Sequence, residues 1–158
     1  MPEKGKWTVS SRGNLFRLGK VPDIPLHIVH VDDHELYAKG VHTSCIQPFF
    51  PAAKITHFLN GTDAFNHIAL NMRMHIVPDL VITDILHMGM NGVMLVTAIR
   101  DLERELQRTR PVPIIVLSFV ALTHPSLGED GMANAVFEKT ADAATIVEAM
   151  ERAMYDRN

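Results

Sequence analysis

The chain has 158 residues, of which 47% are apolar and 21% charged, and these values suit one globular domain with a sizeable core. No apolar run reaches the roughly 18 residues that cross a bilayer, and the amino terminus lacks the apolar stretch of a signal peptide. The single cysteine, Cys45, excludes an internal disulfide. We therefore expect a cytoplasmic protein that does not enter the membrane.

The net charge of −3 is unevenly distributed along the chain. Residues 1–20 contain five lysines and arginines against one glutamate, so they carry +4 and the remainder carries −7. An acidic body disfavours nucleic-acid binding. Residues 1–25 lack sustained periodicity, apart from one short strand expected at 7–9. We predict an amino-terminal extension over 1–25 and one domain over 26–158.

Short apolar runs alternate with helical patterns through that domain. The expected strands cover 26–31, 53–59, 78–83, 113–117 and 133–138. Apolar residues at helical spacing follow four of the five runs. This alternation predicts an α/β fold, in which a parallel sheet is covered by helices on both faces.

The helical patterns also suggest where helices begin, end and meet solvent. Asp33 and Thr140 are placed to cap the first and last helices. The third helix is expected to expose Arg100 and Glu103. The segment 122–131, where a fourth helix is due, contains one proline and two glycines, so any helix there is expected to be short or irregular.

Polar residues stand at the ends of four of the predicted strands. Asp32 and Asp33 follow the first strand, Asp84 the third, Ser118 the fourth and Lys139 the fifth. The carboxyl ends of parallel strands share one edge of the sheet, so we expect these five side chains to meet there.

The residue types indicate phosphoryl transfer to a carboxylate. Clustered carboxylates repel one another unless a cation lies between them, and oxygen ligands favour Mg²⁺. The backbone carbonyl of Leu86 could complete a set formed by Asp32, Asp33 and Asp84. Lys139 would pair with Asp84, and the Ser118 hydroxyl could donate to a phosphoryl oxygen.

With these residues in order, the chain resembles the receiver domains of two-component response regulators, of the chemotaxis CheY-like type. The resemblance covers about residues 26–155. Its motifs are Val31-Asp32-Asp33-His34, Asp79-Leu80-Val81-Ile82-Thr83-Asp84 with Met90 and Gly92, Ile115-Val116-Leu117-Ser118 and Phe137-Glu138-Lys139. It implies a doubly wound, five-stranded parallel sheet in the order 2-1-3-4-5.

The resemblance also implies a role for each site residue. Asp84 would accept a phosphoryl group from a sensor histidine kinase or a phosphotransfer protein. Asp32 and Asp33 would hold Mg²⁺ together with Asp84 and the Leu86 carbonyl, while Ser118 and Lys139 would bind the phosphoryl group.

Activity and partners follow from the same resemblance. The chain would catalyse only its own phosphorylation and dephosphorylation, so we do not expect an enzyme acting on another substrate. Phosphorylation would switch binding of a downstream protein, or the chain would pass phosphate along a phosphorelay. We expect no DNA-binding domain, and a monomer or a weak homodimer.

The sequence departs from the receiver pattern at four positions. Met88 and Thr140 stand where proline is usual, Phe119 where a small residue is usual, and Val136 where an aromatic residue is usual. Met88 is expected to loosen the loop after Asp84. Val136 cannot act as the usual aromatic switch, so either Phe119 replaces it or the switch is damped.

Alternative hypotheses about the function remain open. Val136 and the interrupted fourth helix are compatible with an interaction module that works without phosphate. A phosphatase of the haloacid dehalogenase type would need an acid where Leu86 stands. Nine histidines are scattered without compact ligand spacing, which disfavours zinc, although His34 and His87 flank the acidic site.

Overall fold

The computed structural model describes residues 7–9, 15–17 and 25–155. The short strand expected at 7–9 is confirmed as β1 (Trp7–Val9), which pairs antiparallel with β2 (Leu15–Arg17). No helix in the described ranges is long and apolar enough to cross a membrane.

Five parallel strands form the central sheet. They are β3 (His27–Val31), β4 (Lys54–Phe58), β5 (Leu80–Thr83), β6 (Ile114–Ser118) and β7 (Ala135–Glu138). Their order in space is β4-β3-β5-β6-β7, which confirms the predicted 2-1-3-4-5 arrangement. The sheet is parallel throughout because each connection crosses one of its faces.

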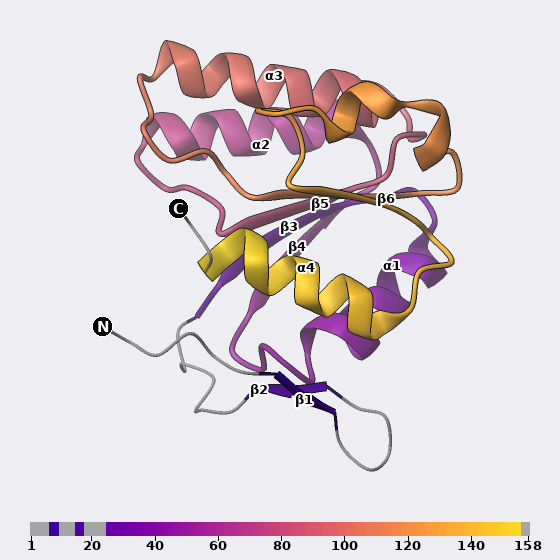
Figure 1. The fold of residues 1–158 in the computed structure, drawn as a ribbon. Helices are drawn as coiled ribbons and strands as arrows, with labels where there is room; N and C mark the ends of the chain where they lie inside the picture. The colour runs from indigo at the N-terminus through magenta and orange to yellow at the C-terminus, as the bar shows by residue number, and fades with distance from the viewer. Residues whose placement is uncertain (1–6, 10–14, 18–24, 156–158) are drawn as a thin grey trace.

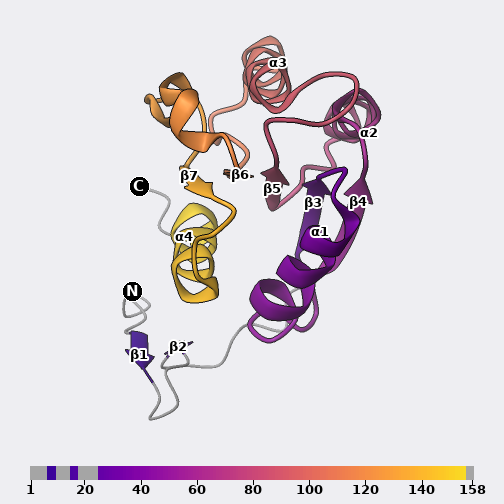
Figure 2. The same ribbon diagram turned by 90° about the vertical axis from the view of Figure 1, so that its right-hand side faces the viewer.

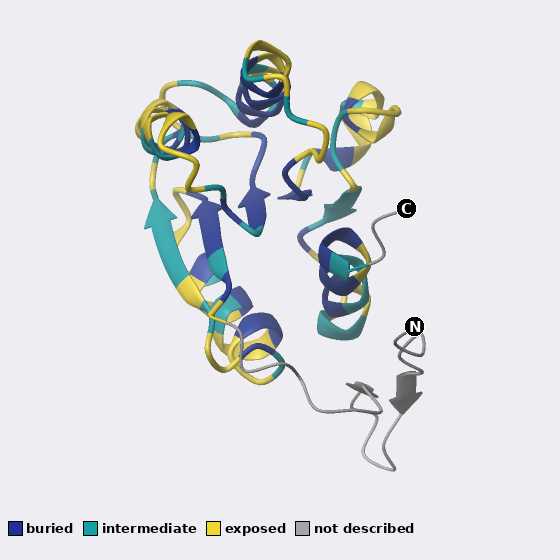
Figure 3. Cartoon of the chain, turned by 90° about the vertical axis from the view of Figure 1, so that its left-hand side faces the viewer, coloured by how far each residue is buried: buried dark blue, intermediate teal, exposed yellow. Residues whose placement is uncertain are grey.

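Helices cover both faces of the sheet (Figures 1 and 2). They are α1 (Glu35–Val41), which continues as a π-helical turn at His42–Ile46, α2 (Gly61–Arg73), α3 (Gly92–Glu105) and α4 (Ala143–Tyr155). Helices α2 and α3 pack on one face, and α1 and α4 pack on the other. Two separate apolar clusters fill the two interfaces, so each helix turns its buried stripe toward the sheet (Figure 3).

The segment between β6 and β7 contains no α-helix, which agrees with the short or irregular structure that its proline and two glycines predicted. Two 3₁₀ turns occupy it, at Ala121–Thr123 and Pro125–Gly128. The segment is nevertheless anchored, because Leu127 is fully buried in the cluster under α2 and α3.

Both predicted helix caps were wrong by one or two residues. His34, not Asp33, caps α1, since its Nδ1 accepts a hydrogen bond from the Tyr37 amide at 3.1 Å. Asp142 takes the place expected for Thr140, and its carboxylate accepts a hydrogen bond from the Thr145 amide at 2.7 Å. This bond lowers the pKa of Asp142 below its usual value. Asp33 is thereby left exposed at the edge of the sheet.

The expectation that Arg100 and Glu103 face solvent was also wrong. Both are buried, with exposed fractions of 8% and 5%. The Arg100 guanidinium donates two hydrogen bonds to Glu103 and others to the carbonyl oxygens of Val112 and Met132. The pair ties α3 to the segment that replaces a fourth helix, and these partners compensate the burial of both charges.

Candidate functional site

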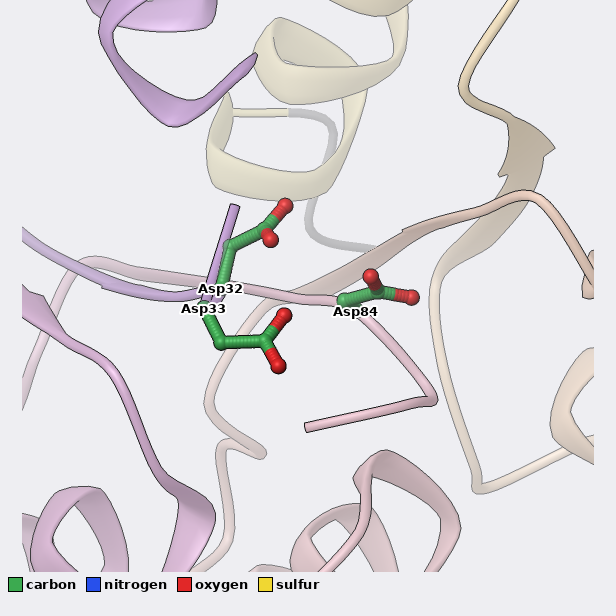
Figure 4. Close-up of side chains that lie close together, drawn as sticks. All are labelled: Asp32, Asp33 and Asp84. Carbon is green, nitrogen blue, oxygen red and sulfur yellow. The ribbon is translucent and has the colours of Figure 1, made fainter. Parts of the chain in front are cut away.

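Three carboxylates lie together at the carboxyl edge of the sheet. One oxygen each from Asp32, Asp33 and Asp84 lies within 4.8 Å of the other two. Figure 4 shows the three side chains rising from the ends of the two neighbouring strands β3 and β5. Asp32 and Asp84 are buried, whereas Asp33 is exposed to solvent. The predicted convergence of these acids is therefore present in the structure.

Lys139, directly after β7, supplies a positive charge to this cluster. Its Nζ lies 2.7 Å from Oδ2 of Asp32 and 2.8 Å from Oδ2 of Asp84. Burial opposes the charged form of Lys139, but the hydrogen bonds and charges of the two acids outweigh it, so the pKa of Lys139 is raised. The ammonium stays charged at neutral pH and partly balances the acids.

Asp32 is held by contacts on both its backbone and its side chain. Its Oδ1 accepts a hydrogen bond from the His34 amide, and its carbonyl oxygen accepts one from Nε2 of His57, both at 2.8 Å. Burial raises the pKa of the Asp32 carboxyl, although Lys139 and the His34 amide act in the opposite direction. Asp32 is thus rigidly placed and carries a desolvation penalty.

Backbone groups orient the Asp84 side chain. Its Oδ1 accepts hydrogen bonds from the amides of Ile85 at 2.6 Å and Leu86 at 3.3 Å. The hydroxyl of Thr83 donates to the Asp84 carbonyl oxygen at 2.8 Å and also contacts Nε2 of His87 at 3.0 Å. One carboxylate oxygen of Asp84 therefore faces backbone donors, and the other faces Lys139.

The acids fit a Mg²⁺ ion. Ligand distances of about 2.0–2.1 Å in an octahedron place neighbouring oxygens about 2.9 Å apart and opposite ones about 4.2 Å apart. The spread of the three carboxylates is compatible with those spacings after small adjustments. Oδ2 of Asp32 is buried, and the cation that already faces it is the Lys139 ammonium at 2.7 Å.

The remaining two predicted site residues lie at the same edge. Ser118 ends β6 and is buried, and its hydroxyl oxygen accepts a 3.3 Å hydrogen bond from the Val120 amide. Its carbonyl oxygen accepts a bond from the Lys139 amide at 3.2 Å, which ties the two residues together. Leu86 lies in the loop after Asp84, and its side chain is exposed.

The loop after Asp84 is held firmly, although Met88 replaces the usual proline. The Gly61 amide donates to the Met88 carbonyl oxygen, and the Met90 amide donates to the Thr62 hydroxyl, both at 3.0 Å. Gly61 must be a glycine here, because a Cβ atom would lie 1.8 Å from the Met90 carbonyl oxygen. The start of α2 therefore replaces the stiffness expected from proline.

Two aromatic rings surround the Lys139 ammonium. Its nitrogen lies 4.5 Å from the ring centre of Tyr37 and 5.4 Å from that of Phe119. Burial raises the pKa of Tyr37 to about 12, so the phenol is neutral. Phe119 is 65% exposed and lies on the outer side of the site. Val136 is half-buried in β7 and offers no ring in its place.

Sequence reasoning did not single out Tyr37, His57 and the start of α2 as contributors. Tyr37 stands at helical spacing with Val41 and Cys45, and this local pattern does not indicate that its ring lies over Lys139. His57 lies mid-strand, and no local pattern indicates that it bonds the Asp32 carbonyl. These residues reach the site through contacts that form only when the sheet assembles.

The fold matches solved receiver domains. A receiver domain of the response regulator NarL from Mycobacterium tuberculosis superposes with a TM-score of 0.61 at 21% identity, covering 84% of this chain and 98% of that one. The receiver domain protein from Clostridium thermocellum gives 0.62 at 16% identity, with 83% and 95% covered. This chain has the receiver-domain fold.

A third solved receiver is similar to the same extent. The phosphorylated cyanobacterial phytochrome response regulator RcpA gives a TM-score of 0.63 at 14% identity, with 85% of this chain and 98% of that chain covered. The TM-scores above 0.6 establish a shared receiver fold, and at identities this low the function has to be argued from the site. No family model matches the sequence, and no curated protein matches it.

Proposed function

We propose that this chain is a response-regulator receiver that accepts a phosphoryl group on Asp84. The observation that carries the proposal is the arrangement around that carboxylate. Asp84 is buried beside two other acids, yet one of its oxygens faces the Lys139 ammonium and the other faces backbone amides. A purely structural site would not place three acids together with one lysine that pairs with only two of them.

The proposed chemistry is an in-line transfer from a phosphohistidine. A carboxylate oxygen of Asp84 forms a bond to phosphorus while the bond from phosphorus to the donor nitrogen breaks, and that nitrogen keeps the electron pair. In this proposal Lys139, which already lies beside Asp84, and the Ser118 hydroxyl would contact the phosphoryl oxygens on Asp84. Bound Mg²⁺ would neutralise charge on those oxygens, held by Asp32, Asp33, Asp84 and the Leu86 carbonyl.

The surroundings of the site favour a protein as phosphoryl donor. Among the described residues, most exposed large apolar side chains lie in loops or first helical turns at this edge of the sheet. They are Leu36, Leu59, Leu86, Met88, Met94, Phe119 and Leu122. Exposed apolar side chains gathered around a polar centre are typical of a protein-binding surface. A sensor histidine kinase or a phosphotransfer protein fits this rim.

The phosphorylated chain would then change its affinity for a downstream protein. Phe119 is the aromatic residue placed to respond, because its exposed ring lies against the Lys139 ammonium. A phosphoryl group on Asp84 would compete for that ammonium. The contact between Lys139 and the Phe119 ring would then weaken, and the ring could move. The chain would catalyse no reaction beyond its own phosphorylation and dephosphorylation.

Intact-mass spectrometry after incubation with acetyl phosphate and Mg²⁺ tests the proposal. We expect an adduct of one phosphoryl group that depends on Mg²⁺ and is absent from Asp84→Asn. Asp130→Asn is the matched control, because Asp130 is an exposed acid with no recorded contact to the cluster. The control should be phosphorylated like the natural chain.

Transfer from a phosphorylated histidine kinase is the second arm, because the proposed donor is a protein. If neither acetyl phosphate nor a set of phosphorylated kinases labels a folded sample, the proposal is wrong. An interaction module that works without phosphate would then explain the fold, and Asp84→Asn would keep full partner binding.

A further inference from the structure

A polar pocket lies at the carboxyl ends of α2 and α3, away from the acidic site. Its volume is about 310 Å³, near the lower limit for small-molecule pockets. Its lining includes three arginines, Arg73, Arg108 and Arg110, together with His75 and Gln107. No acid lines the pocket, although the chain as a whole carries a net charge of −3.

The arginines of this pocket are incompletely paired. Arg73 makes one 3.4 Å contact with Glu105, and both side chains are more than half exposed, so the pair is weak and easily exchanged. Arg108 donates to the Arg110 carbonyl oxygen at 3.3 Å, and its Nε is buried without any hydrogen-bond partner. A buried guanidinium nitrogen of this kind requires an acceptor.

Two residues lining the pocket adopt a backbone conformation that favours glycine. His75 and Gln107 follow the caps of α2 and α3 with φ values of 63° and 53°. At both ends the next amide bonds back to the helix, from Ile76 to Asn71 and from Arg108 to Glu103. Glycine is the usual residue at this position, because it has no Cβ penalty.

A side chain at either of these two positions therefore makes the backbone conformation less stable than it would be with glycine. Both side chains belong to polar residues, and both line the same pocket as the three arginines. Backbone strain at His75 and Gln107, after two separate helices but in one pocket, indicates that their side chains have a role there. Imidazole and carboxamide groups can both donate hydrogen bonds to an anion.

We propose that this pocket binds a small phosphorylated anion. Arg73, Arg108 and Arg110 supply the charge, and His75 and Gln107 add hydrogen-bond donors. Guanidinium groups suit phosphate because their planar donors match its oxygens. The partial negative charge of the helix ends opposes an anion, but the capping amides already bond carbonyl groups of the last turns, those of Asn71 and Glu103 among them. This inference does not depend on phosphorylation of Asp84.

A titration of the full chain with inorganic pyrophosphate tests the proposal. Amide shifts are followed by NMR in EDTA at constant ionic strength, with sodium chloride as the matched salt. We expect saturable shifts that centre on residues 72–76 and 106–110, and none from chloride. Shifts that chloride reproduces, or that spread over all exposed cations, would overturn the site.

Three variants separate a built site from ordinary surface charge. Arg108→Gln with Arg110→Gln should weaken pyrophosphate binding at least tenfold, whereas Arg152→Gln, on α4, should not change it. His75→Gly with Gln107→Gly should weaken binding at least threefold while leaving the melting temperature equal or higher. If the double-glycine protein binds pyrophosphate as well as the natural chain, the strained side chains have no role in binding and the proposed site is wrong.

Discussion

The Lys139 ammonium nitrogen lies 2.8 Å from Oδ2 of Asp84, although the strands that carry the two residues are separated by β6. The same nitrogen lies 2.7 Å from Asp32. One lysine thus holds the two buried acids of the site at a fixed separation. The stability of the domain and its proposed chemistry depend on the same ion pairs.

Removing this lysine should destabilise the fold. In Lys139→Met, two buried acids lose their cation, and a broken buried pair of this kind costs about 3–5 kcal/mol. Urea denaturation at neutral pH measures the change. Lys54→Met is the control, because Lys54 is exposed and its loss should cost well under about 1 kcal/mol. A loss for Lys139→Met as small as the control would contradict the burial of these charges.

The raised pKa of Asp32 predicts a pH dependence of stability. Since burial raises this pKa, the folded state holds the proton more tightly than the unfolded chain, and the contribution of Asp32 to stability falls as pH rises above about 3.9. The stability of Asp32→Asn relative to the natural chain should therefore increase from pH 4 to pH 7, by about 1.4 kcal/mol per unit of pKa shift. Denaturant unfolding in EDTA across that range checks the sign. A difference that stays constant or decreases would show that the pKa is not raised.

A single methyl group at the start of α2 should disturb the phosphorylation loop. In Gly61→Ala the new Cβ would lie 1.8 Å from the Met90 carbonyl oxygen and 2.6 Å from Cε1 of His87. We expect a loss of about 1–3 kcal/mol and slower phosphorylation of Asp84. Gly40→Ala is the matched control, because a Cβ there meets nothing within 4 Å. That helical substitution should stabilise the chain by about 0.5–1 kcal/mol and leave phosphorylation unchanged.

Loss of the buried Arg100–Glu103 pair in α3 should lower the stability of the fold far more than loss of the exposed Arg104–Asp101 pair. Arg100→Met leaves the Glu103 carboxylate buried without its cation and releases the carbonyl groups of Val112 and Met132, at a cost of about 3–5 kcal/mol. Arg104→Met removes an exposed pair with Asp101 and should cost less than about 1 kcal/mol. Thermal unfolding of both variants gives the comparison, and equal losses would argue against the buried network.

The fold and the acidic cluster could be predicted because their signals are local. Short apolar runs define the strands, and the helical patterns between them require parallel crossovers. Asp32, Asp33, Asp84, Ser118 and Lys139 each directly follow or end a strand, so parallel pairing alone places them at one edge. The proline and glycines at 122–131 likewise predicted the loss of a regular helix, and the structure confirms it.

Only the tertiary structure decided how these elements contact one another. Arg100 and Glu103 have the local pattern of a solvated helix face, yet the segment near Met132 covers them. Met88 was expected to loosen its loop, yet the Gly61 amide at the start of α2 bonds its carbonyl oxygen. Tyr37 has the spacing of an apolar helix face, yet its ring lies over Lys139. In each case the partner lies far away in the chain, and local periodicity carries no information about such contacts, because they form only when helices pack on the assembled sheet.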